Sequence, residues 1–144
     1  MINRMHWAAL TLASVLFAAP AVLRAEVVVI VSAKNPSGPL TAEQVSNIFL
    51  GKANAFPGGG TAVPIDQSES SPVRKEFYTK AAGKDDSQMK AYWSRIVFTG
   101  KGTPPKEAGG SADVKNLVSS NPNMIGYVEK SAVDASVKVL FSAP

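Results

Sequence analysis

Polar residues that could together bind an anion lie close to one another in the sequence: Asp66, Ser68, Ser70, Ser71 and Arg74. Hydroxyl and guanidinium groups donate hydrogen bonds to the oxygens of a tetrahedral oxyanion. Ser71 precedes Pro72, a pair typical of a helix start, because serine caps free backbone amides and proline has no N–H to lose. The first turn of a helix presents unpaired N–H groups and a partial positive charge. The segment therefore predicts an oxyanion site at a helix N-terminus.

The same residues also have ordinary structural roles, which remain as alternatives. Ser68, Ser70 and Ser71 are typical of turns and helix caps. Asp66 follows a strand-like run over residues 61–65 and could simply form the turn at its end, and Arg74 could be a solvated or salt-bridged surface charge. A well-capped surface helix would contain the same sequence without any ligand.

Residues 1–25 have the layout of a secretory signal peptide. A short start containing one arginine precedes an apolar run over residues 7–23, and small residues follow. A retained membrane anchor needs about 20 strongly apolar residues, whereas this run is rich in alanine and no stop-transfer pattern follows it. We expect cleavage after Ala25, with Ala21 as the alternative. Residues 26–144 would then form one domain in the periplasm, with no membrane anchor.

Composition argues against several classes of site. Loss of Arg4 and Arg24 with the signal peptide would lower the formal net charge from +4 to +2, which does not favour binding to nucleic acid. The chain has no cysteine, and its one histidine, His6, lies in the predicted signal peptide. Disulfides, thiolate catalysis and histidine-based catalytic or metal sites are therefore excluded from residues 26–144. An enzyme would have to use serine with lysine or a carboxylate, so we expect no enzyme, no cofactor and no metal.

Strands and helices alternate along residues 26–144, which indicates an α/β fold. The β-branched run at residues 26–32 suits a strand buried on both faces, and Ser32 and Lys34 follow it, where open α/β sheets often bind ligands. Thr41 and Gln44 form a capping box for a helix that Gly51 ends. We expect further strands over 61–65, 124–128 and 136–141. We also expect helices from Pro72 to near Gly83, from Asp85 or Asp86, and from Ser111 until Asn121-Pro122-Asn123 terminates the last one. The helix after Asp85 or Asp86 has a predicted apolar stripe of Met89, Trp93, Ile96 and Val97.

Three segments in a fixed order resemble the phosphate-type periplasmic substrate-binding proteins of ABC transporters. Residues 40–52 end in Ile-Phe-Leu-Gly-Lys and look like that family's helix with an "IFxGK" ending. Residues 63–77 contain Val-Pro-Ile-Asp, the serine turn and Arg74. Residues 118–128 end in Ile-Gly-Tyr-Val, which resembles the family's "IGYV" strand. The resemblance covers most of residues 26–130 and implies a single periplasmic-binding-protein-like lobe, a mixed β-sheet flanked by helices.

The resemblance also implies roles for the predicted site, with two departures. Ser68, Ser70 and Ser71 match the family's hydroxyl-bearing turn, and Asp66 matches an aspartate that accepts a proton from monohydrogen phosphate. However, no arginine precedes Asp66, Ser70-Ser71-Pro72 replaces a Ser-Gly-Thr ending, and Glu69 adds a negative charge. Family members also have two lobes that close around the ion, whereas this chain is long enough for one.

Two functional hypotheses follow. In the first, the chain is an exported soluble binding module for phosphate or a similar small oxyanion, linked to ABC-type uptake or sensing. In the second, it is an exported interaction module that has kept the lobe and lost the ligand. Either module could contact a transporter permease, a sensor ectodomain or a second subunit.

Overall fold

Strand β1 (Val27–Ser32) lies inside the sheet, and all of its residues are buried, as its β-branched sequence predicts. The computed structural model describes residues 26–143; the predicted signal peptide, residues 1–25, lies outside the described residues. Alternate side chains of β1 pack on opposite faces of the sheet. Val27, Val29 and Val31 join one apolar cluster, whereas Val28 and Ile30 join another. The sheet is therefore the middle layer of three.

The sheet of the described residues has the order β3 (Lys106–Glu107), β2 (Val63–Asp66), β4 (Met124–Glu129), β1 and β5 (Val137–Ala143). β2 runs parallel to β3 and β4, whereas β1 runs antiparallel to β4 and β5. The sheet is thus mixed, as predicted. β2 and β4 end at the same edge of the sheet, where edge means the row of strand ends and not an outer strand. β1 ends at the opposite edge.

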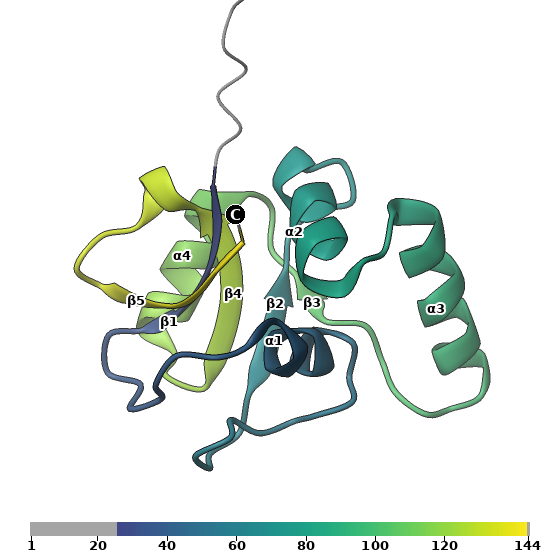
Figure 1. Cartoon of the computed structure of the whole chain (residues 1–144), viewed down its shortest axis with the longest axis horizontal. Coiled ribbons are helices and arrows are strands. Elements are labelled where there is room, and N and C mark those ends of the chain that lie inside the picture. Colours follow the sequence, from purple (N-terminus) through teal and green to yellow (C-terminus); the bar gives the residue numbers. More distant parts are fainter. Residues whose placement is uncertain (1–25, 144) are drawn as a thin grey trace, which may run out of the picture.

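Helices cover both faces of the sheet (Figure 1). One face carries α1 (Ala42–Phe49) and α2 (Pro72–Ala82), whose Phe49 and Phe77 pack edge to face with ring centres 4.9 Å apart. The other face carries α4 (Ser111–Ser120), with Val114 and Val118 buried against the sheet. Helix α3 (Asp86–Phe98) lies at the side of the molecule (Figure 1). No helix among residues 26–143 has both the length and the apolar character that a membrane span needs.

The helix boundaries follow the predicted caps. Thr41 and Gln44 form the capping box of α1, and Gly51 just after this helix has a left-handed φ of 73°. Ser71 is the N-cap of α2, and Gly83 ends it with a φ of 63°. Of the two aspartates considered for α3, Asp85 is the cap.

Three details of the fold differ from the expectation or add to it. The apolar stripe of α3 is only half buried: Met89 and Trp93 lie in the core, but Val97 is 51% exposed. The two-residue strand β3 was not predicted, because Lys106-Glu107 is a polar pair without the pattern of a strand. Both of its residues are exposed in the structure. Ser32 lies at the edge opposite Asp66, and its buried hydroxyl donates to the carbonyl of Ser119 (3.3 Å).

Candidate functional site

Two helices begin at the edge of the sheet where β2 and β4 end. α2 follows β2 directly through the turn at residues 67–71, and α4 reaches the same edge because it runs back along β4. Ser111, in the first turn of α4, accepts hydrogen bonds through Oγ from the backbone N–H of Glu129 (3.4 Å) and from Nε2 of Gln67 (3.1 Å). Helix N-termini carry a partial positive charge, so this edge favours a bound anion.

Asp66 is the last residue of β2, and hydrogen-bond donors surround its carboxylate, which is almost fully buried. Tyr78 donates to Oδ2 (2.8 Å), and Tyr127 donates to Oδ1 through a short hydrogen bond. The backbone N–H of Gln67 also donates to Oδ1 (2.9 Å). Arg74 adds an ion pair, with Nε 3.3 Å from Oδ1. Asp66 therefore joins β2 to α2 and β4, and both of its oxygens already have donors from the protein.

Arg74 lies in the first turn of α2 and is only 9% exposed. Its Nε forms an ion pair with Asp66 rather than an aligned hydrogen bond, and the guanidinium carbon lies 5.3 Å from the centre of the Tyr78 ring. Burial lowers the pKa of Arg74, but the charge of Asp66 opposes this and the net pKa is raised. Arg74 stays charged, and its two terminal nitrogens donate no hydrogen bond to any described residue.

The two tyrosines beside Asp66 are held in the neutral form. Burial is the main reason that the pKa of Tyr78 lies well above its ordinary value, and the negative charge of Asp66 raises it further. The same two causes, in the same order, raise the pKa of Tyr127. The ring of Tyr127 also stacks on Phe77, with centres 4.0 Å apart and planes 8° from parallel. Both hydroxyls are therefore permanent donors at ordinary pH.

Ser71 and Gln67 fix the path of the turn. Ser71 Oγ accepts from the backbone N–H of Arg74 (3.4 Å), as predicted for a helix cap, and donates to Oε1 of Gln67 (2.7 Å). Gln67 is buried, and its Nε2 also donates to the backbone carbonyl of Tyr127 (2.9 Å). The Ser71 hydroxyl is thus fully engaged within the protein.

Ser68 and Ser70 lie on the outer side of the turn. Their Oγ atoms are 3.2 Å apart and bond to each other, and Ser70 is exposed. The backbone N–H of Ser68 donates to the carbonyl of Gly109 (3.1 Å), which holds the turn against the loop before α4. Glu69 lies between the two serines and is exposed. These two hydroxyls can be reached by solvent or a ligand, as can the guanidinium of Arg74 where it lines a groove.

An apolar groove of about 740 Å³ runs from the turn along α3. Arg74 and Glu69 lie at the turn end of the groove. The remaining lining residues are mostly from α3: Asp86, Ser87, Met89, Lys90, Trp93, Ser94, Val97, Phe98 and Pro104. The groove is far larger than one phosphate ion needs, but its charged end coincides with the guanidinium of Arg74.

The predicted site residues are thus brought together in part. Asp66, Ser71 and Arg74 lie in one buried network, whereas Ser68 and Ser70 pair on the surface beside it. No three or more acidic or histidine side chains among residues 26–143 lie together as metal ligands would. Which of these residues contact a ligand stays a prediction.

The sequence analysis missed three members of the network: Gln67, Tyr78 and Tyr127. For two of them, Tyr78 and Tyr127, the sequence contains a clue to their place in the network. Tyr78 lies one helical turn after Arg74, so both side chains lie on the same face of α2. Tyr127 lies in the Ile-Gly-Tyr-Val strand, but its contact with Asp66 depends on the pairing of β2 with β4. Gln67 had no signal beyond its place next to Asp66.

Comparisons with solved structures show what this fold is similar to. A phosphate ABC transporter substrate-binding protein from Clostridium perfringens, in a structure with bound phosphate, has a TM-score of 0.66 and 26% sequence identity, over 81% of this chain and 44% of that chain. An ABC-type phosphate transport receptor from Vibrio cholerae has a TM-score of 0.64 and 19% identity, over 81% and 45% of the two chains. PstS from Borrelia burgdorferi has a TM-score of 0.61 and 14% identity, over 81% and 46%.

The predicted resemblance to phosphate-type substrate-binding proteins and the predicted α/β fold class are confirmed by these neighbours. At 19% and 14% identity, the second and third neighbours show the fold alone. This chain spans less than half the length of each of these proteins. No protein-family model matches the sequence, and no curated protein matches it.

Proposed function

We propose that this protein is an exported binding module for phosphate or a similar oxyanion, which binds where α2 begins. The observation that carries the proposal is the position of Arg74. A buried and permanently charged guanidinium lies in the first turn of a helix, with two terminal nitrogens that no described residue uses. The exposed hydroxyls of Ser68 and Ser70 lie on the turn just before this helix. A structural neighbour that contains bound phosphate supports the same ligand class.

In this proposal Asp66 holds Arg74 in place. Its carboxylate already accepts hydrogen bonds from two tyrosine hydroxyls and a backbone amide, so it has little capacity left to accept a proton from the ligand. Ser71 also has a structural role, because it is the cap that orients the first turn of α2. The direct contacts then come from Arg74, Ser68, Ser70 and the backbone N–H groups of Glu69 and Ser70. The other N–H groups of the turn donate within the protein.

The site is open to water, which limits its affinity. Glu69 is exposed on the same turn, and a like charge about 4 Å from an anion costs about 1 kcal/mol in water. We therefore expect weak binding, in the millimolar range, unless a second subunit or a partner such as a transporter permease or sensor ectodomain covers the site. Export to the periplasm rests on the signal-like residues 1–25.

We do not propose an enzymatic activity. Ser87 and Lys90 lie one turn apart in α3, which is the spacing of a serine–lysine pair, and both line the groove. Both residues are exposed, however, and no hydrogen bond joins them in the described part of the chain. A lysine that acts as a general base needs burial to lower its pKa.

Isothermal titration calorimetry with phosphate and with sulfate tests the proposal. We expect saturable binding, weakened about tenfold or more by Arg74→Lys, because a charge-assisted hydrogen bond contributes about 1.5–3 kcal/mol. The double variant Ser68→Ala/Ser70→Ala should also bind more weakly, and it should leave the fold intact, because the two hydroxyls bond only to each other. Ser131→Ala, an exposed serine elsewhere, is the matched control. No heat from the wild-type protein at millimolar anion would refute the proposal.

A second candidate function, an interaction module, is favoured by the exposed end of α3. Phe98 is 92% exposed, and Val97 is half exposed beside it. Large apolar side chains on a surface often mark a contact with another protein. A pulldown from the exported fraction would favour this candidate if Phe98→Ser abolished capture of a partner and Ser70→Ala did not.

A further inference from the structure

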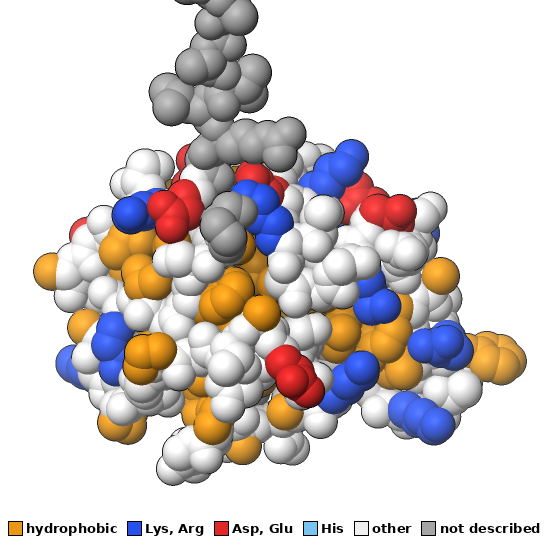
Figure 2. Space-filling view, in the orientation of Figure 1, with side chains coloured by type: hydrophobic (Ala, Val, Ile, Leu, Met, Phe, Trp, Pro, Cys, Tyr) orange, Lys and Arg blue, Asp and Glu red, His pale blue; other side chains and the backbone are white. Residues whose placement is uncertain are grey.

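A second, smaller cleft of about 340 Å³ lies between the end of α1 and helix α3. It is lined by Leu50, Gly51, Lys52, Tyr92, Trp93, Arg95, Ile96, Lys101 and Gly102. We call it the basic cleft, because three of these residues are cations and none is a carboxylate. In Figure 2, Lys and Arg side chains surround an apolar patch on the right-hand side of the molecule, where α3 lies. The turn at residues 67–71 contributes nothing to this cleft.

The same backbone motif places the two lysines of the basic cleft. α1 ends in a Schellman motif: the N–H of Gly51 donates to the carbonyl of Ile48 (3.2 Å), and the N–H of Lys52 donates to that of Asn47 (2.8 Å). α3 ends in the same way. There the N–H of Gly100 donates to the carbonyl of Val97 and the N–H of Lys101 to that of Ile96, both at 3.1 Å. Lys52 and Lys101 therefore occupy equivalent positions at two neighbouring helix ends.

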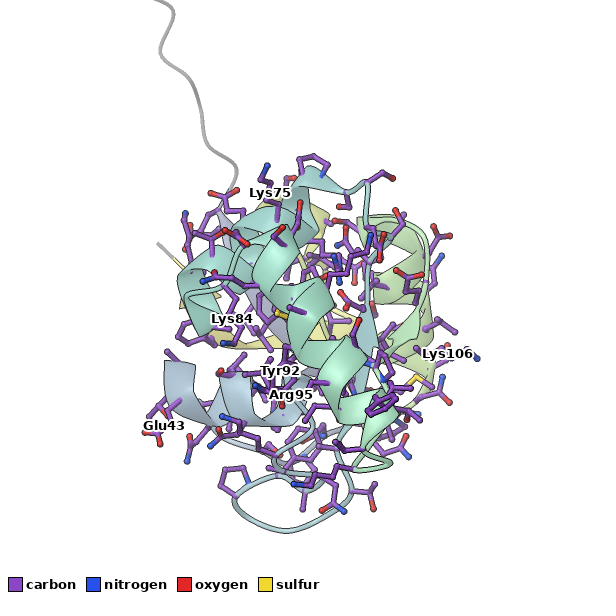
Figure 3. All side chains as sticks on the ribbon, turned by 90° about the vertical axis from the view of Figure 1, so that its right-hand side faces the viewer. Glu43, Lys75, Lys84, Tyr92, Arg95 and Lys106 are labelled. Carbon is purple, nitrogen blue, oxygen red and sulfur yellow. The ribbon has the colours of Figure 1, made fainter. Side chains whose placement is uncertain are left out.

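Aromatic contacts fix the two helix ends relative to each other. The hydroxyl of Tyr92 donates to the backbone carbonyl of Leu50 (2.6 Å), which ties α3 to the end of α1. A Cβ built on Gly51 would lie only 3.2 Å from the ring of Trp93, so the indole packs directly on this glycine. The guanidinium of Arg95 lies over the Tyr92 ring at 5.7 Å, and these two side chains lie side by side in Figure 3. The floor of the cleft is therefore preorganised.

The positive charge of the basic cleft is not balanced within the described residues. Lys52, Arg95 and Lys101 appear in no ion pair and in no side-chain hydrogen bond of residues 26–143, and Glu43 lies at the far end of α1 (Figure 3). Two helix C-termini together supply roughly one negative charge, about half a charge each. Three cations exceed this, so about two positive charges remain for a ligand.

We propose that the basic cleft binds a compact anion with at least two negative charges, of the pyrophosphate class. Its volume lies at the lower end of the range for small-molecule sites, roughly 300–1,000 Å³. Two lysines and an arginine line it, all three exposed to solvent, and lysine and arginine are the side chains that bind phosphate groups. This site is separate from the one at the start of α2 and stands whether or not that site binds phosphate.

Fluorescence titration of Trp93 with pyrophosphate tests this inference. Trp93, which lines the cleft, is the one tryptophan of residues 26–144. Trp7 lies in the predicted signal peptide, and Trp7→Phe removes its fluorescence from protein that keeps that segment. We expect saturable quenching that becomes about tenfold weaker or more in Lys52→Gln/Lys101→Gln, because two charge-assisted contacts are lost. Neither lysine side chain has a partner within residues 26–143, so the variant should keep the melting temperature of its parent.

The matched control is Lys106→Gln/Lys130→Gln, which removes the same charge from exposed positions outside the cleft. Equal weakening in the two double variants would overturn the inference, since the effect would then come from net charge alone. The absence of saturable quenching in the Trp7→Phe parent would also overturn it. Calorimetry with phosphate on Ser68→Ala/Ser70→Ala reports on the other site, so failures at the two sites can be told apart.

Discussion

Asp66 shows how one carboxylate can be assigned two quite different roles. Its place before a serine turn predicted a ligand contact, whereas in the fold it accepts hydrogen bonds from Tyr78 and Tyr127 and forms an ion pair with Arg74. A buried carboxylate is costly unless donors surround it. Here the partners come from two elements, α2 and β4, so the network stabilises the packing of α2 against the sheet and also positions Arg74.

The tyrosines of this network predict how stability depends on pH. In the folded chain the pKa values of Tyr78 and Tyr127 are raised, whereas in the unfolded chain they are about 10. Their contribution is therefore fully present below pH 10 and is lost as the pH rises, because only the unfolded chain then releases the protons. Each tyrosine should lower the free energy of unfolding by about 1.4 kcal/mol per pH unit above this point.

Urea unfolding between pH 8 and pH 11.5 measures this slope. Above pH 10, Tyr127→Phe should make the fall of the unfolding free energy with pH less steep by roughly 1.4 kcal/mol per pH unit, because one titrating group has been removed. Val118→Ala, a core variant that keeps every tyrosine, should lower stability at all pH values and leave the slope unchanged. Equal slopes in wild type and Tyr127→Phe would contradict the assigned pKa shift.

Helix and strand positions could be read from the sequence where local chemistry decides them. Thr41 and Ser71 cap their helices as predicted, and Asp85, one of the two aspartates considered, caps α3, because a cap depends on residues within one turn. β3 could not be predicted, because its polar residues pair only where the loop meets β2. The burial of α3 was overestimated at Val97 for a similar reason, since Met89, Trp93 and in part Ile96 pack against the core and Val97 does not.

The site was predictable to a lesser extent than the fold. The turn and its helix start lie in one continuous segment, so Ser68, Ser70 and Arg74 could be found. The partners of Asp66 could not, because Tyr127 reaches it only through the parallel pairing of β2 with β4. Long-range contacts of this kind depend on strand order and register, which cannot be read from the residue pattern of a single sequence.

The close contact between α4 and the sheet at Gly126 of β4 predicts that a larger residue there destabilises the protein. A Cβ at this position would overlap Cγ1 of Val114 and lie 3.2 Å from Cγ2 of Val118. Gly126→Ala should therefore push α4 from the sheet and destabilise the protein by about 1–3 kcal/mol. Gly38→Ala is the matched control, since nothing lies within 4 Å of a Cβ there. Chemical denaturation would measure both, and equal stability of the two variants would contradict this packing.

The overall architecture explains why a ligand, if bound, must be bound weakly. The chain corresponds to less than half of each structurally similar substrate-binding protein. Its site at the start of α2 has a buried cation and a preorganised helix end, but the turn is exposed on its outer side. Water competes for every donor at such a site, so affinity depends on what covers it.

The most direct measurement is an NMR titration of the isotopically labelled protein with phosphate, which follows every backbone amide. We predict saturable shifts confined to the amides of residues 68–71, 73 and 74, since Pro72 has no N–H, and none in β5 at the far side of the sheet. Arg74→Lys should weaken these shifts, and Ser131→Ala should not. Unchanged amides at residues 68–74 in millimolar phosphate would contradict the proposed anion site.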